Sequence, residues 1–179
     1  MTERPLRGEP LSLDLVNTEW EEGGTPRDLF DGPGGASDWL AEHGYAGGSE
    51  AALREVRAAL RAQLEQNDPG PLNAVLARGT RRPVLGSDGR PGELVEVDPE
   101  WRAAWDAAVD HLRLLAERPD RVRPCAHPSC VLWFHDTSRN GTRRWCSMEA
   151  CGNRAKAGRH YARTRGSGSQ PLVRRPQRP

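Results

Sequence analysis

The chain has 179 residues, of which 36% are apolar and 28% are charged. This length suits one ordinary domain, or one domain with a small appendage, and the low apolar fraction leaves much of the chain as surface, loop or tail. The sequence contains no run of about eighteen apolar residues, and no apolar stretch follows the first basic residues. We therefore predict a cytoplasmic protein without a membrane span or a signal peptide.

The net charge of +1 conceals two segments of opposite sign. Residues 1–120 contain 13 Lys and Arg against 23 Asp and Glu, a net charge of −10. Residues 121–179 contain 13 against 2, a net charge of +11. This asymmetry predicts two modules with different partners, and the basic module is the candidate for binding a polyanion.

The acidic segment predicts a mostly helical domain over residues 8–120. Apolar residues on adjoining faces predict a short first helix with Leu11, Leu13, Leu15, Val16 and Trp20. Ser37 and Ser49 are candidate N-caps of two further helices. After Ser49, apolar residues recur at helical spacing at Leu53, Val56, Leu60 and Leu64.

Two short strands and a long helix are predicted in the second half of this domain. The Asp88-Gly89 turn signal joins strands at 82–85 and 93–97 into a hairpin. Asp98 is then a candidate N-cap, with Pro99 at the first helical position. The apolar stripe of this helix is Trp101, Trp105, Ala108, Leu112 and Leu115. We interpret the stripe as core packing, and a dimer interface is the alternative.

The four cysteines follow the spacing Cys-x4-Cys, fifteen residues, Cys-x4-Cys. In a reducing compartment such clustered thiols are typically metal ligands, and four thiolates suit a tetrahedral zinc ion. An iron–sulfur cluster, a redox dithiol pair and inert buried thiols are alternatives, but the first has other usual spacings and the second prefers Cys-x-x-Cys. We predict one structural Zn²⁺ per chain, bound by Cys125, Cys130, Cys146 and Cys151.

The residues around the cysteines predict a hairpin and a helix. Residues 131–134 and 143–145 are candidate strands on either side of an Asn140-Gly141 turn. Ser147 is a candidate N-cap of a helix that carries Cys151, an arrangement like a treble clef. Residues 166–179 have no means of forming a core, and we predict a disordered basic tail there.

The helix after Ser147 carries a cationic face. On a helical wheel Lys156, Arg159 and Arg163 lie together, while Arg154 lies on the opposite side. A cationic helix beside a rigid zinc site is able to enter the major groove of duplex DNA. We therefore predict that this face binds DNA; a solvated basic face without a partner is the alternative. The residues predicted to contact phosphates are Arg139, Arg143 and Arg144.

Two runs of sequence resemble known families. The run from Cys125 to Arg165 contains Asp136-Thr137-Ser138-Arg139, Arg143-Arg144-Trp145-Cys146-Ser147-Met148 and Cys151-Gly152-Asn153-Arg154, and it resembles the CGNR zinc-finger family. Leu13-Asp14-Leu15-Val16-Asn17-Thr18 resembles the opening of the ABATE domain, the usual partner of that finger. Together the two resemblances cover about residues 8–165.

The resemblance implies a bacterial, stress-induced transcription regulator that is mainly α-helical. It implies a helical ABATE-like domain over 8–120 and a zinc-bound, DNA-binding finger over 121–165, with the four cysteines as metal ligands. Beyond the ligands, we predict that Asn153 and Arg154 have structural roles around the metal.

We accordingly predict a zinc-dependent DNA-binding transcriptional regulator. The acidic helical domain would sense a small-molecule ligand or form a homodimer, and a stability scaffold without a signal is the alternative. A zinc-stabilised module that binds RNA or protein is the alternative, because zinc folds serve all three roles. We predict no enzyme: Asp14, Asn17 and His43 can be assembled into a site, but no nucleophile elbow, phosphate loop or metal triad is visible.

Overall fold

The structure is a computed structural model that describes residues 4–157. Its α-helices are α1 (Leu11–Val16), α2 (Gly35–Glu42), α3 (Glu50–Gln66), α4 (Gly70–Leu76) and α5 (Arg102–Glu117). Its strands form three two-stranded antiparallel sheets, β1 (Glu19–Glu22) with β2 (Thr25–Asp28), β3 (Thr80–Leu85) with β4 (Pro91–Glu96), and β5 (Val122–Pro124) with β6 (Trp133–His135). No helix in this part of the chain is long and apolar enough to cross a membrane.

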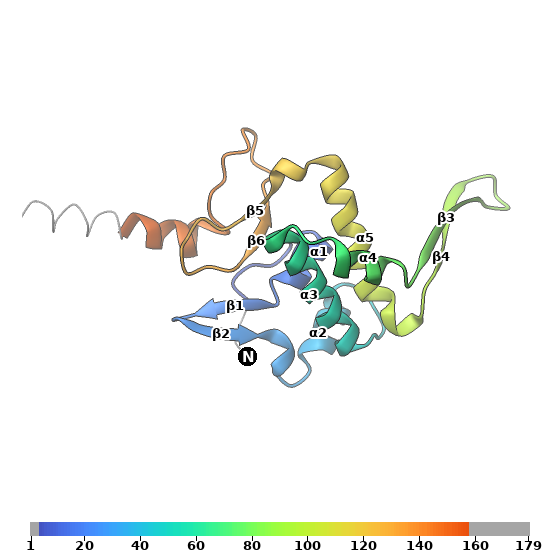
Figure 1. Cartoon of the computed structure of the whole chain (residues 1–179), viewed down its shortest axis with the longest axis horizontal. Coiled ribbons are helices and arrows are strands. Elements are labelled where there is room, and N and C mark those ends of the chain that lie inside the picture. Colours follow the sequence, from blue (N-terminus) through green and yellow to red (C-terminus); the bar gives the residue numbers. More distant parts are fainter. Residues whose placement is uncertain (1–3, 158–179) are drawn as a thin grey trace, which may run out of the picture.

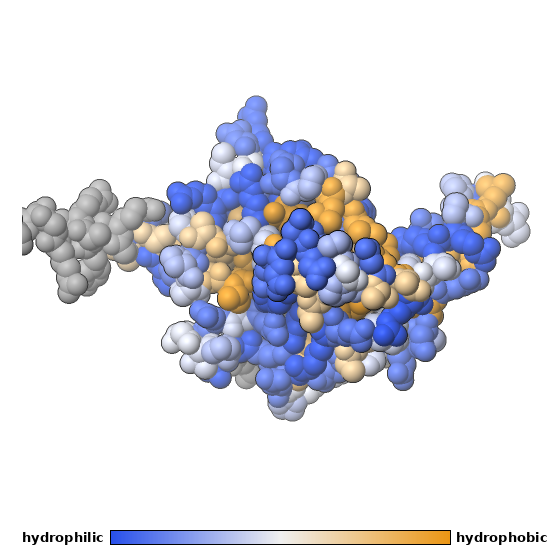
Figure 2. Space-filling view, in the orientation of Figure 1, coloured by the Kyte–Doolittle hydropathy of each residue, from blue (hydrophilic) through white to orange (hydrophobic). Residues whose placement is uncertain are grey.

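The chain is mainly helical, as predicted, with small hairpins and a cysteine cluster. The helices gather in the middle of the molecule, the β3–β4 hairpin projects from one end, and the β5–β6 segment lies towards the other end (Figure 1). In the view of Figure 2, apolar surface lies near the end of the β3–β4 hairpin and over part of α5. Exposed apolar side chains on these elements are Val84, Leu85 and Leu94 of the hairpin and Leu112 of α5.

The two longest helices begin where the capping residues predict. The Ser49 hydroxyl accepts the N–H of Ala52 at 3.2 Å, and α3 starts at the next residue. The Asp98 carboxylate accepts the N–H of Glu100 at 2.9 Å, and a 3-10 turn (Pro99–Trp101) leads into α5. Each bond satisfies a backbone donor that the first turn leaves free.

The predicted cap at Ser37 is wrong. Helix α2 begins at Gly35, after Gly34 in the left-handed region with φ 76°. The Ser37 hydroxyl instead donates to the carbonyl of Gly34 at 2.8 Å. A glycine turn therefore starts this helix in place of a side-chain cap, which is why a search for Ser, Thr, Asp or Asn caps misplaced it.

The buried face of α5 differs from the predicted stripe. Leu112 is 44% exposed. The buried residues of this helix are Ala103, Ala104, Trp105, Ala107, Ala108, His111 and Leu114. The alanines let α5 approach α1 and α3 closely, and the buried His111 Nε2 lies 2.7 Å from Gln63 Oε1. Because this face consists mainly of alanines and a histidine, the pattern of large apolar residues did not predict it.

The β1–β2 hairpin was not predicted. Trp20 belongs to β1, whereas its spacing from Val16 assigned it to the first helix. The register pairs Glu22 with Thr25 around a two-residue turn, Gly23-Gly24, with φ 60° and 83°. Positive φ at both positions is what a two-residue type I′ hairpin turn requires, so the Gly-Gly pair is the signal that was available in the sequence.

The predicted pairing of 131–134 with 143–145 is also wrong. Strand β6 pairs with β5, with Val122 opposite His135. The 143–145 segment contributes a single backbone bond to this region, from the N–H of Ala126 to the carbonyl of Arg144 at 2.8 Å. Residues 122–124 were not predicted to form a strand, although proline is tolerated on an edge strand.

Candidate metal centre and its surroundings

The four cysteines come from separate segments that converge. Cys125 follows β5, Cys130 precedes β6, Cys146 lies in a loop, and Cys151 lies in a π-helical turn (Met148–Gly152). Their sulfur atoms all lie within 4.8 Å of one another. The Cys130–Cys146 and Cys146–Cys151 sulfur distances are 3.8 Å and 3.6 Å.

These distances fit a zinc ion. Four thiolates at about 2.3 Å from a tetrahedral zinc are separated by about 3.8 Å from one another. Soft, anionic sulfur ligands favour zinc over hard cations such as Mg²⁺ or Ca²⁺. Among the described residues the cluster contains four ligands and no carboxylate or imidazole. It is therefore a closed, structural type of site with no position open to a substrate.

The clustered thiols do not ionise independently of one another. Hydrogen bonds from the Cys130 and Cys146 thiols lower the pKa of Cys125 far below its usual range. The bond to Cys125 raises the pKa of Cys130 to about 12 and that of Cys146 further. A divalent ion bound to the four sulfurs would favour the thiolate form of all of them.

Donors around the cluster stabilise the sulfur charge. The backbone N–H of Cys146 donates to Cys125 Sγ at 3.4 Å, and Arg154 Nη2 donates to Cys151 Sγ at 3.1 Å. Asn153 Nδ2 donates to the carbonyl of Glu149 at 3.3 Å, within the turn that carries Cys151. Ser147 caps that turn by accepting the N–H of Ala150 at 3.0 Å. Arg154 thus contacts a ligand sulfur, and Asn153 bonds within the turn that carries Cys151.

The structure separates the predicted DNA-contacting residues into three groups. Arg139, Arg144 and Lys156 are exposed, and the Arg144 guanidinium lies 5.2 Å from the centre of the Trp145 ring. Arg159 and Arg163 lie outside the described residues. The chain is helical at 153–157, so the predicted helix is described only over its first part.

Arg143 forms the third group because its guanidinium is occupied. Nε donates to the carbonyl of Trp145 at 3.0 Å, and Nη2 donates to the carbonyl of Cys146. The group also lies 4.3 Å from the centre of the Phe134 ring. These contacts hold the backbone next to a metal ligand and leave little of the guanidinium for a phosphate.

Asp136 is a buried residue that the motif analysis did not assign a role. It is 2% exposed and accepts the N–H groups of Ser138 at 2.9 Å and Arg143 at 3.1 Å. Arg121 and Arg123 lie 4.0 Å and 3.7 Å from its carboxylate. Asp136 therefore organises the loop between β6 and Cys146. As one of only two acidic residues in 121–179, it was visible in the sequence.

The small core of the finger includes residues of the helical domain. Trp20 from β1 is 5% exposed and packs with the finger's buried residues, which are Cys125, Leu132, Phe134, Cys146 and Cys151. Leu6 and Leu29 pack against the same cluster. The charge pattern of the sequence indicated two separate segments. No pattern in the sequence indicated that residues of the helical domain pack in the core of the finger.

Asp14, Asn17 and His43 do not form a single site. Asp14 is fully buried, and its Oδ1 accepts bonds from Arg4 Nη1, from Trp39 Nε1 at 2.8 Å and from His43 Nε2 at 3.0 Å. Burial alone would raise the pKa of Asp14, but the bonds from His43, Arg4 and Trp39 hold it below the ordinary value. Asn17 turns instead towards the backbone of Trp133.

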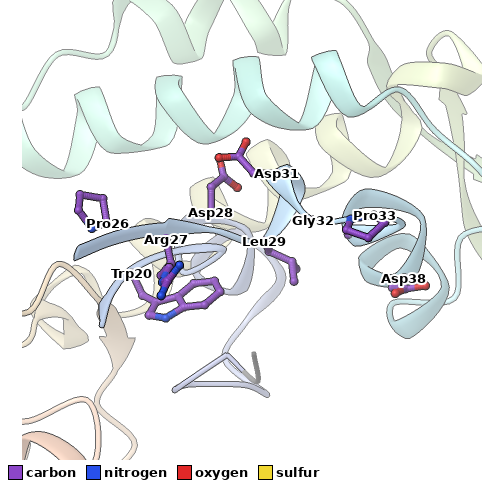
Figure 3. Close-up of a pocket in the computed structure, with 10 residues that line it drawn as sticks. Trp20, Pro26, Arg27, Asp28, Leu29, Asp31, Gly32, Pro33 and Asp38 are labelled. Carbon is purple, nitrogen blue, oxygen red and sulfur yellow. The ribbon is translucent and has the colours of Figure 1, made fainter. Parts of the chain in front are cut away.

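A pocket of about 460 Å³ lies beside the β1–β2 hairpin. In Figure 3, Trp20 and Arg27 lie on one side of it, and Pro33 and Asp38 lie on the other. Asp28 also lines the pocket, but its carboxylate is bound by Arg57 at 2.6 Å. Leu53, Val56 and Leu60 do not line this pocket and are buried in the helical core.

A helical domain joined to a closed four-thiolate centre defines a zinc-finger protein. Residues 9–118 match the ABATE family model, described as "Putative stress-induced transcription regulator", and residues 121–164 match the CGNR zinc finger. The chain therefore belongs to the ABATE family and carries a CGNR zinc finger with one structural zinc ion, which confirms the resemblance noted in the sequence. No curated protein matches the chain.

Proposed function

We propose that the chain is a zinc-dependent, DNA-binding transcriptional regulator whose finger contacts DNA. The observation that carries this proposal is the charge distribution, a net +11 over 121–179 against −10 over 1–120. Neutralising DNA phosphates with cationic side chains supplies most sequence-independent affinity. The family that matches residues 9–118 is described as a transcription regulator, which supports the same function for this chain.

The proposed contact surface consists of exposed basic residues near the zinc centre. Within the described chain these are Arg139, Arg144 and Lys156, and we add Arg159 and Arg163 from the sequence pattern. Arg139 and Lys156 make no ion pair with another residue of 4–157, so their charge is available to a phosphate. We leave Arg143 out of this surface because backbone carbonyls and Glu9 bind its guanidinium.

In this proposal the helical domain is the sensor or the dimerisation module. The pocket beside β1–β2 has a volume in the range of small-molecule sites. Trp20 lines that pocket and also packs in the finger core, so a bound ligand would touch a residue shared by both parts. The exposed Leu112 on α5 and the exposed Val84, Leu85 and Leu94 of the β3–β4 hairpin are the surfaces available to a second copy.

Selection from random oligonucleotides tests the proposal. Full-length, zinc-loaded protein is incubated with a pool of duplex DNA and, in parallel, with a pool of single-stranded RNA. We expect an enriched duplex motif whose affinity falls steeply with salt. A palindromic motif would indicate a homodimer. Enrichment from the RNA pool alone would favour the RNA-binding alternative, and enrichment from neither would leave protein binding as the function to test.

A further inference from the structure

The outer edge of β6, on the side away from β5, is completed by side chains. In an antiparallel pair, successive residues direct their backbone groups alternately towards and away from the partner strand. The carbonyl of Leu132 and the N–H of Asp136 bond to the β5 side, at 2.9 Å and 2.8 Å. Trp133 and His135 therefore direct their N–H and C=O groups outward, where unpaired groups in a protein interior are costly.

Asn17 pairs with Trp133 as a neighbouring strand would. Its Nδ2 donates to the carbonyl of Trp133 at 2.8 Å, and its Oδ1 accepts the N–H of Trp133 at 2.9 Å. A carboxamide offers one donor side and one acceptor side in the same arrangement as a peptide group. Asn17 is fully buried and directly follows α1, so the helical domain fixes its position.

Glu9 and Arg143 complete the other half of the edge. Glu9 Oε2 accepts the N–H of His135 at 2.8 Å, and Arg143 Nη1 donates to the carbonyl of His135 at 3.4 Å. Glu9 Oε1 also accepts Arg143 Nη2 at 3.4 Å. The Glu9 side chain is only 9% exposed, so this carboxylate is held among these donors and away from solvent.

Arg143 extends the connection to the metal centre. The same Nη2 that contacts Glu9 donates to the carbonyl of Cys146, a zinc ligand. A chain of contacts therefore runs from Glu9 in the helical domain, through Arg143, to the backbone that aims the Cys146 sulfur. The guanidinium binds Trp145, Cys146 and His135 together, so its position fixes β6 relative to the ligand loop.

We propose that Asn17 and Glu9 are positioning residues of the zinc centre, through which the helical domain slows loss of the metal. Neither residue touches a sulfur atom. Both act on the backbone of β6, and Glu9 acts also on Arg143. The inference goes beyond the proposed function, because it concerns retention of zinc and does not require that the chain bind DNA.

Zinc release requires the thiolates to separate, which requires local opening of the finger away from the helical domain. Removing a partner of a buried backbone group destabilises the closed form and leaves the open form nearly unaffected. The fraction of open molecules then rises, and the rate of zinc release rises with it. For the loss of one such set of buried bonds we expect a change of about 10-fold.

The test measures zinc release from the full-length, zinc-loaded chain to an excess of a chromogenic chelator. The variants are Asn17→Ala and Glu9→Ala, each expected to release zinc about 10-fold faster than the natural sequence. Matched controls are Asn73→Ala on α4 and Glu117→Ala on α5, both exposed and on elements that do not bond to β6. The controls should release zinc at the natural rate.

Two further measurements separate positioning from folding. Far-UV circular dichroism reports whether the helices persist, and the visible spectrum of the Co²⁺-substituted variants reports whether the thiolate geometry changes. We expect intact helices and an altered Co²⁺ spectrum in Glu9→Ala. If Asn17→Ala loses helical structure, the Glu9→Ala result decides the question. Release at the natural rate in Glu9→Ala, or equal acceleration in the controls, overturns the proposal.

Discussion

The helical domain and the zinc finger are stabilised by different means. The helical domain buries a continuous apolar cluster between α1, α2, α3, α4 and α5. The finger buries few apolar side chains of its own, chiefly Leu132 and Phe134, and gains Trp20 from β1. Where a segment is too small to form a core, a metal ion and contacts from a neighbouring domain replace apolar burial. The comparison predicts that the two regions respond differently to the same perturbation.

Removing zinc should have the largest effect, and it should be confined mainly to one region. Structural zinc in small modules contributes about 10–16 kcal/mol of apparent binding energy, far more than the finger's apolar burial. With zinc chelated, or in Cys151→Ser, we expect residues 122–157 to lose protection from hydrogen exchange. Because Trp20 packs on the finger, β1–β2 should lose part of its protection as well. Helices α3 and α5 should remain protected.

Hydrogen-exchange mass spectrometry of the full chain, with and without chelator, locates these changes. Loss of protection in α3 and α5 together with the finger would mean that the two regions unfold as one unit. Protection of β1–β2 that is independent of zinc would mean that the packing of Trp20 contributes little to the hairpin.

The contrast between the regions also explains what the sequence could predict. Helical period, Ser49 and Asp98 located α3 and α5, since capping and periodicity are local properties of the chain. Cysteine spacing located the metal centre, because four thiolates in one segment have few other uses. Local sequence patterns did not predict contacts between residues that lie far apart in the sequence. Asn17 and Trp133 are 116 positions apart in the sequence, and no period connects them.

A second perturbation belongs to the helical domain alone. Asp14→Asn removes the charge that three donors share and leaves the buried Arg4 without its closest carboxylate. Breaking a buried ion pair from one side costs about 3 kcal/mol. Urea unfolding of the zinc-loaded protein measures this loss. The control is Glu42→Gln, because the partly exposed carboxylate of Glu42 also binds Arg4. This substitution should lower the free energy of unfolding by less than about 1 kcal/mol.

The Asp14→Asn substitution should also change how the stability of the protein depends on pH. Because the pKa of Asp14 is lowered in the folded protein from an ordinary 3.8, its stabilising effect is present above that pH. The effect is lost as pH falls through the folded-state pKa. Stability measured across the acid range should therefore fall less steeply in Asp14→Asn than in the natural sequence. An equally steep fall in both would mean that other carboxylates, such as Asp28, dominate acid unfolding.

A third comparison contrasts arginines within the finger. Arg139→Ala and Arg144→Ala should each reduce the slope of log affinity for DNA against log salt by about one unit, the effect of one lost phosphate contact. Arg143→Ala should change that slope little once zinc is bound, and should accelerate zinc release, because Arg143 binds backbone carbonyls. An equal decrease of the slope in all three variants would indicate that Arg143 also contacts DNA.

The smallest predicted effect tests helix capping with two serines. Ser49→Ala removes the acceptor for the N–H of Ala52 at the start of α3, which buries Leu53, Val56 and Leu60 in the domain core. Loss of such a cap costs about 1 kcal/mol, and for a chain of this length the melting temperature should fall by about 2–4 °C.

Ser37→Ala is the matched control, because Ser37 has the same side chain and also lies near the start of a helix. Its hydroxyl is exposed and only donates to the carbonyl of Gly34, while the first N–H groups of α2 receive no bond from it. We therefore expect the free energy of unfolding of Ser37→Ala to differ from that of the natural sequence by no more than about 0.5 kcal/mol. Equal losses in the two variants would mean that α2 depends on Ser37 as a cap after all, and that the glycine turn at Gly34 does not by itself determine where the helix starts.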